Sequence, residues 1–122
     1  MKKEILNWLK NIEQQDGTPP AEVIVFNFGL LESDGGYMMY LVGGFEYSEE
    51  DDNWAIFDLP TKDYRYLQFP DDMQEESWEN VLEIAETALK ELEKEGELNK
   101  TLVRKAQALT TGFDDGDLIK IR

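Results

Sequence analysis

Carboxylates are the side chains of this chain that offer the most chemistry, and two runs of them contain no basic residue. The first run spans 46–58 and holds six acids; the second spans 71–86 and holds seven. Carboxylates at this density can hold a divalent cation, transfer protons, or bind the lysines and arginines of a partner. The acids are Glu46, Glu49, Glu50, Asp51, Asp52 and Asp58 in the first run, and Asp71, Asp72, Glu75, Glu76, Glu79, Glu83 and Glu86 in the second.

The residues that usually accompany carboxylates in an active site are missing. The chain contains no histidine and no cysteine, which excludes Ser-His and Cys-His nucleophiles, thiolate metal sites and disulfides. Its glycine pairs at 35–36 and 43–44 lack the spacing of a phosphate-binding loop. We therefore expect no catalytic activity and no cofactor, with a carboxylate-based enzyme as the alternative.

A third acidic feature is the segment 111–118, which contains Asp114, Asp115 and Asp117. Three carboxylates within four residues are hard oxygen ligands of the kind that divalent cations prefer. The ligand spacing of the twelve-residue calcium loop is absent, however, and Asp and Gly are also typical of tight turns. We expect a turn here, with a metal site as the alternative. A third possibility is that this turn joins the partner-binding surface and adds its three acids to the other two runs.

Clustered like charges raise the energy of a compact fold, so the two runs favour a surface that meets something positive. In the first run, Tyr47 and Trp54 bracket four of the six acids, and aromatic residues among charges are typical of recognition sites. The alternative is that the acidic surface binds no partner and only aids solubility. The predicted partner-binding residues are Tyr47, Glu49, Glu50, Asp51, Asp52, Asp71, Asp72, Glu75 and Glu76. By their helical spacing, Trp8 and Trp78 are expected in the core.

Bulk properties limit the class of protein. The chain has 122 residues, a net charge of -15 and 41% hydrophobic residues, which indicates one folded domain over 1–122. It has no signal-peptide pattern and no apolar run long enough to span a bilayer, so we expect a soluble cytoplasmic protein. Its charge disfavours binding to nucleic acid or to anionic lipid.

The elements that must position these residues can be read from hydrophobic spacing. Helical spacing predicts helices over 2–14 and 78–95, the second capped by Ser77. The apolar segment 23–31 is typical of a central strand with both faces covered, and a turn at 33–36 joins it to a second strand. Further strands are expected at 37–44, 54–57, 63–69 and 118–122. The segment 101–109 fits either a third helix or a turn leading into a strand, and we favour the strand. The expected fold is α+β: an antiparallel sheet of four to six strands packed against two or three helices, with the N-terminal helix first.

The segment 36–44 (Gly-Tyr-Met-Met-Tyr-Leu-Val-Gly-Gly), followed by Tyr47, the acidic run and Trp54, resembles small acidic α+β proteins of bacterial genomes. So does the segment 111–117. The group is that of the immunity proteins of polymorphic toxin and contact-dependent inhibition systems. The resemblance implies a cytoplasmic protein that binds a toxin domain, often a basic nuclease, and occludes its active site without catalytic residues of its own. A divalent-cation-binding protein and a scaffold domain with no dedicated ligand remain alternatives, and self-association is left open.

Overall fold

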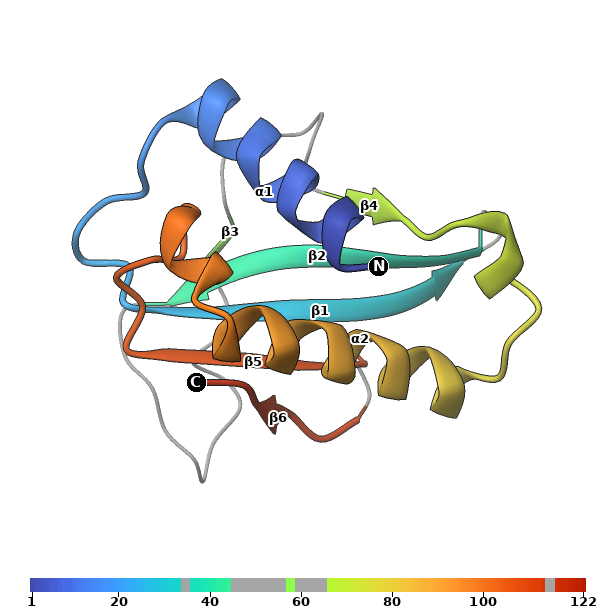
Figure 1. The fold of residues 1–122 in the computed structure, drawn as a ribbon. Coiled ribbons are helices and arrows are strands. Elements are labelled where there is room, and N and C mark those ends of the chain that lie inside the picture. The colour runs from blue at the N-terminus through green and yellow to red at the C-terminus, as the bar shows by residue number, and fades with distance from the viewer. Residues whose placement is uncertain (34–35, 45–56, 59–65, 114–115) are drawn as a thin grey trace.

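The computed structural model describes residues 1–33, 36–44, 57–58, 66–113 and 116–122 (Figure 1). The predictions made for 34–35, 45–56, 59–65 and 114–115 concern residues outside this description. The described elements follow the chain in this order: α1 (Lys2–Asp16), β1 (Val25–Ser33), β2 (Gly36–Gly44), β3 (Phe57–Asp58), β4 (Tyr66–Gln68), the 3-10 helix η2 (Asp71–Met73), α2 (Trp78–Lys94), the 3-10 helix η3 (Glu97–Lys100), β5 (Ala108–Phe113) and β6 (Ile119–Lys120).

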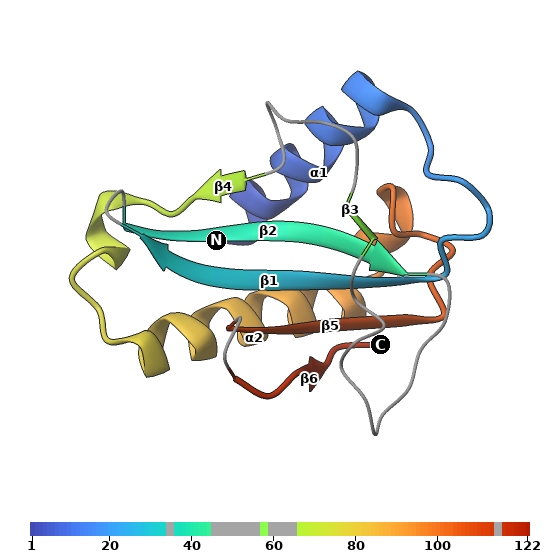
Figure 2. The ribbon, with the colours of Figure 1, turned by 180° about the vertical axis from the view of Figure 1, so that it is seen from behind.

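One sheet contains all the described strands, and its order can be followed in Figure 2 as β3-β2-β1-β5-β6. The short strand β4 pairs with β2 as well, over Met38–Tyr40, while β3 pairs with Val42 and Gly43. β1 and β2 form an antiparallel hairpin from Val25↔Gly44 to Ser33↔Gly36. The α+β fold with the N-terminal helix first is therefore confirmed.

The sheet is mostly antiparallel, but β5 runs parallel to β1, from Val25↔Ala108 to Leu30↔Phe113. This parallel pair was not expected. β2 already occupies one edge of β1, and the chain returns along α2 before it reaches the other edge. β4 is antiparallel to β2 and therefore runs in the same direction as β1. Because α2 returns the chain after β4, β5 runs in that direction as well.

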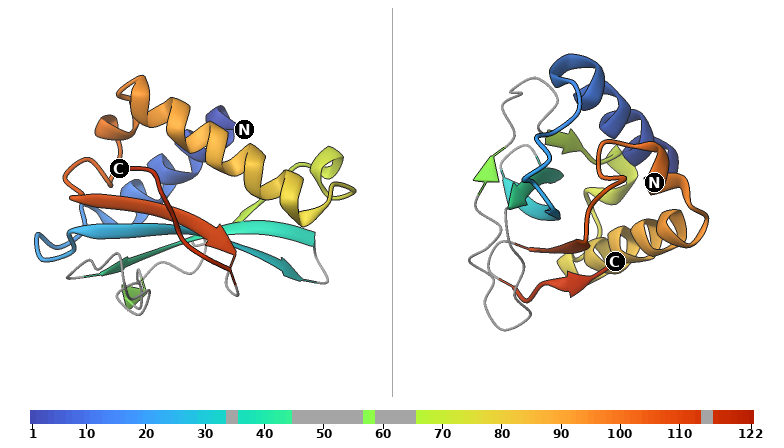
Figure 3. Two further views of the ribbon diagram at one scale, coloured as in Figure 1. Left: turned by 90° about the horizontal axis from the view of Figure 1, so that it is seen from below. Right: turned by 90° about the vertical axis from the view of Figure 1, so that its left-hand side faces the viewer.

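Both α-helices pack on the same face of the sheet (Figure 3, left). The predicted apolar stripe of α1 is confirmed, because Ile5, Trp8, Leu9 and Ile12 are all buried. Helix α2 buries Val81, Ala85, Ala88, Leu89 and Leu92. The sheet supplies alternate residues to this core, including Phe26, Phe28, Leu30, Met39 and Leu41.

Strand β1 is buried on both faces, as its continuous apolar run predicts. Val25 is fully buried on the face opposite the helices, where it packs with Ala108. On that face the buried Asn27 side chain accepts a hydrogen bond of 2.9 Å from the Thr110 hydroxyl of β5. This bond satisfies two polar groups that would otherwise destabilise the interior.

The segment after α2 contains turns and then a strand, so the strand alternative is confirmed. Gly96 ends α2 with φ at 77°, in the left-handed region that glycine adopts readily. The Thr101 hydroxyl donates to Leu98 O at 2.7 Å and accepts from Val103 N at 3.3 Å, and these local bonds compete with a helix. Arg122 then closes the fold: its guanidinium binds both carboxylate oxygens of Glu93 at 2.6 and 2.8 Å, and the carbonyl of Ala106 at 3.0 Å.

Candidate functional site: an acidic surface at one end of the sheet

The structure describes part of the predicted partner-binding set. Asp71, Asp72, Glu75 and Glu76 are all exposed, on η2 and in the turn that follows it. The other predicted residues, Tyr47, Glu49, Glu50, Asp51 and Asp52, lie outside the described residues. Of the alternative metal ligands, Asp117 is exposed, while Asp114 and Asp115 lie outside the described part. Within that part, no group of three or more acidic side chains is placed to hold a metal ion.

The exposed acids of η2 continue onto the first two turns of α2. We call these six residues the acidic platform: Asp71, Asp72, Glu75, Glu76, Glu79 and Glu83. Glu86, the last acid of the run, differs from them because Lys90 contacts its carboxylate at 2.6 Å. Among residues 1–33, 36–44, 57–58, 66–113 and 116–122, no lysine or arginine forms an ion pair with a platform carboxylate.

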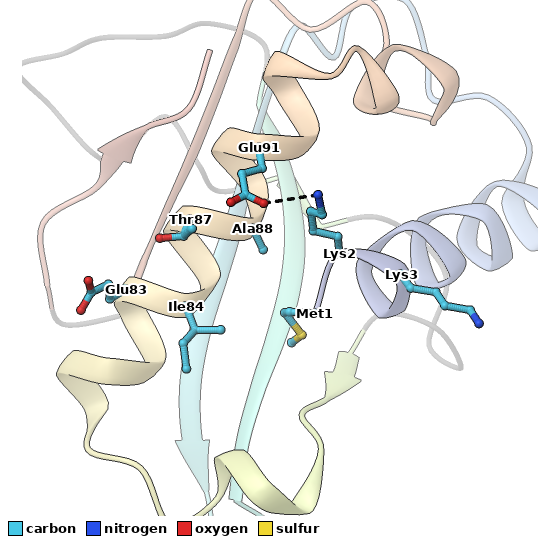
Figure 4. A pocket seen from close by; sticks show the side chains of 8 residues that line it. All are labelled: Met1, Lys2, Lys3, Glu83, Ile84, Thr87, Ala88 and Glu91. Carbon is cyan, nitrogen blue, oxygen red and sulfur yellow. Dashed lines mark ion pairs between the residues drawn. The ribbon is translucent and has the colours of Figure 1, made fainter.

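Acids elsewhere on α2 are paired, so the platform stands apart from the rest of the helix. Lys2 Nζ lies 3.3 Å from Glu91, across the hollow that separates the start of α1 from α2 (Figure 4). It also lies 3.1 Å from Glu95. The hydrogen bonds to Glu95 and Glu91 raise the pKa of the Lys2 ammonium. The carboxylates of the C-terminal half of α2 are therefore paired with bases, whereas those of its first two turns have no basic partner among the described residues.

Gln74 fixes the platform to the sheet. Its Oε1 atom accepts a hydrogen bond of 2.6 Å from the backbone N–H of Tyr37, and its Nε2 atom donates to Phe69 O at 3.0 Å. The fit is close, since a Cβ atom on Gly36 would lie 2.0 Å from Gln74 Oε1 and Gly36 itself has φ at 101°. Met73, between Asp72 and Gln74, is buried in the core. The acids thus project from a segment that is anchored on its inner side.

Tyr37 forms a second attachment. Its hydroxyl donates to Glu76 O at 3.1 Å, so the backbone N–H and the hydroxyl of Tyr37 together hold both ends of the segment 74–76. Burial raises the pKa of the Tyr37 phenol, and the nearby carboxylates of Glu32 and Glu79 raise it further. Negative charge from the end of β1 and from the start of α2 therefore converges on this tyrosine.

The start of α2 is set by local chemistry. The Ser77 hydroxyl accepts a hydrogen bond from Asn80 N at 3.3 Å, which confirms the predicted N-cap. Glu79 lies in the first turn, where the helix dipole favours a carboxylate. The Asn80 side chain donates to Glu76 Oε2 at 3.0 Å and orients that acid.

Trp78 was expected in the core, and this prediction is wrong. Its side chain is 55% exposed, whereas Trp8 is 4% exposed. The Trp78 and Phe113 rings form a T-shaped pair at a centroid distance of 6.1 Å, and Phe113 in turn contacts Tyr37 at 6.2 Å. Phe113 is the last residue of β5, so the sheet ends beneath the first turn of α2 and leaves most of Trp78 uncovered.

These features share one end of the molecule, where β1 ends and β2 and α2 begin (right in Figure 1). None of the described helices is long and apolar enough to cross a lipid bilayer. The chain matches no family model, no curated protein and no solved structure. The chemistry of this end of the fold is therefore the basis for assigning a function.

Proposed function

We propose that this protein binds a basic protein through its acidic platform and inhibits it, in the manner of an immunity protein that covers a toxin's nuclease-like active site. The observation that carries the proposal is a set of six exposed carboxylates, on an anchored segment and the start of α2, that form no ion pair with any residue the structure describes. Such a segment keeps like charges close together at a cost in stability, and a cationic surface would offset that cost. The protein acts by binding and not by catalysis.

The mechanism follows from the positions of the charges. Carboxylates of the platform would take the places of substrate phosphates between the partner's lysine and arginine side chains. Opposite potentials raise the rate of encounter, and this effect weakens as salt screens the charges. Anchoring by Gln74 and Tyr37 means that little conformational entropy is lost when the platform binds, which favours a slow release.

The test is a comparison of two triple variants with the same change in net charge. The platform variant is Asp71→Lys, Asp72→Lys and Glu75→Lys. The control is Glu91→Lys, Glu95→Lys and Glu97→Lys, at and just beyond the C-terminal end of α2. Both sets of carboxylates lie on the surface, so both variants should fold, which circular dichroism would verify.

Each tagged protein is used to capture partners from a lysate of the native host at low salt, followed by elution with rising salt. We expect the parent and the control to retain one basic protein, and the platform variant to bind it about 100-fold more weakly, since close charge pairs at interfaces contribute several kcal/mol. The purified partner is then assayed for nuclease activity with and without the parent protein. Equal retention by all three proteins, or equal loss in both variants, would refute the role of the platform.

A further inference from the structure

An aromatic groove lies beside the acidic platform, between α2 and the ends of β1 and β5. It has a volume of about 970 Å³ and is lined by apolar side chains and two exposed acids. We call these six residues the aromatic groove: Leu30, Trp78, Leu82, Phe113, Glu32 and Asp117. Leu30 is fully buried and forms the floor.

Contacts among aromatic rings hold the apolar side chains of the groove in place. The rings of Tyr37, Phe113 and Trp78 contact one another edge to face in a row, with interplanar angles of 71° and 86°. Tyr37 is in turn fixed by its hydrogen bond to Glu76 O. A large, rigid and half-exposed indole loses little conformational entropy on binding, which is why tryptophan is common at the centre of protein interfaces.

The charge of the groove decides what can occupy it. Glu32, Asp117 and the neighbouring Glu79 form no ion pair with any described residue. Phosphate groups, nucleic acids and anionic lipid headgroups are repelled by such a rim. A second copy of this chain is disfavoured as well, because a symmetric contact would place two acidic platforms against each other.

We infer that the aromatic groove receives an apolar side chain of a basic protein partner, with flanking lysine or arginine residues held by Glu32 and Asp117. A flanking cation is also attracted to the exposed face of Trp78. The inference rests on the proposed function, since it names the part of the surface that selects among basic proteins. The charges of the acidic platform attract the partner. The aromatic groove then requires an apolar residue at a defined position in the partner's sequence.

The probes are three capped nonapeptides: one alternating Lys and Leu, one alternating Lys and Gly, and one alternating Ser and Leu. Binding is followed by NMR through the indole N–H signals of the three tryptophans, and Trp78→Phe assigns the Trp78 signal. We expect the Lys-Leu peptide to shift the Trp78 signal, and the other two peptides to bind at least ten times more weakly.

Two variants and a control locate the binding. Trp78→Ala removes the wall, and Glu32→Gln combined with Asp117→Asn removes the rim charge; each should weaken the Lys-Leu peptide at least tenfold. Tyr66→Ala removes another exposed aromatic side chain, 46% exposed on β4, and should leave the affinity unchanged. Because Trp78 and the two acids are exposed, these variants are expected to keep the fold.

Several results would overturn the inference and leave the proposed function standing. One is salt-sensitive binding of both lysine peptides that is unaffected by Trp78→Ala, since the platform alone would then bind. Equal binding of the Ser-Leu peptide would refute the charge selection, and no shift with any peptide would refute the groove. A Trp78 signal that moves on dilution without peptide would identify a second copy as the occupant. The proposed function is tested independently of the peptides, by the loss of partner binding in the platform variant.

Discussion

The side chain of Gln74 offers the sharpest test of how the acidic platform is held. In Gln74→Ala, the N–H of Tyr37 and the carbonyl of Phe69 lose hydrogen bonds of 2.6 and 3.0 Å. Each bond contributes about 1 kcal/mol, and a partly buried group left without a partner costs about 1–3 kcal/mol. Water reaches part of this region, so we expect a total loss of about 2–4 kcal/mol in the free energy of unfolding.

The measurement is urea unfolding followed by far-ultraviolet circular dichroism. With a slope of about 1–3 kcal/mol per molar urea, the midpoint should fall by roughly 1 M or more. Gln15→Ala is the matched control, because Gln15 is exposed on α1, and its effect should stay within about 0.5 kcal/mol. If Gln74→Ala also changed the free energy by less than about 0.5 kcal/mol, the anchoring of the platform through Gln74 would be refuted.

The remaining predictions concern other parts of the fold. Trp8→Ala should cost about 3–5 kcal/mol by urea unfolding, whereas Trp78→Ala should cost less than about 1 kcal/mol, because Trp8 is buried and Trp78 is exposed. Arg122→Ala should cost about 3 kcal/mol, and a double-mutant cycle with Glu93→Gln should show coupling, since the two side chains share two hydrogen bonds. The pKa of Tyr37 is raised, so its contribution to stability is complete below pH 10 and is lost as pH rises through the folded-state value; in a tyrosinate absorbance titration, Tyr37→Phe should remove a late-titrating component. Finally, the thermal midpoint of the parent should rise on addition of salt at low ionic strength, because a net charge of -15 is then screened; an unchanged midpoint would contradict charge repulsion in the folded state.

The order of the elements followed from the sequence because hydrophobic spacing is a local property. It identified the buried face of α1 and the burial of β1 on both sides. The partner of β1 in the parallel pair has no local signal, since β5 reaches it only after α2 has returned the chain. Spacing along a helix likewise says which side chains share a face, but not where the sheet beneath them ends.

Only part of the candidate site was predicted, again because a sequence pattern is a local property. Charges such as Asp72 and Glu75 are exposed in almost any fold, so a run of them is a reliable sign of surface. The groove, in contrast, depends on residues from three distant parts of the chain: Glu32, Trp78 and Phe113. Gln74 also gave no signal, because a glutamine in a polar turn becomes an anchor only when a particular backbone N–H lies against it.

The parallel pairing of β1 with β5 has a consequence for how the protein folds. β2 can join β1 through a short turn, but the hydrogen bond between the Thr110 hydroxyl and Asn27 joins residues 83 positions apart. Closing so long a loop is slow, so docking of β5 is expected to be a late step in folding. Until residues 108–113 have been synthesised, one edge of a highly apolar central strand stays open, and an open edge of that kind is a template for aggregation. The chain is therefore most vulnerable to aggregation before residues 108–113 are made.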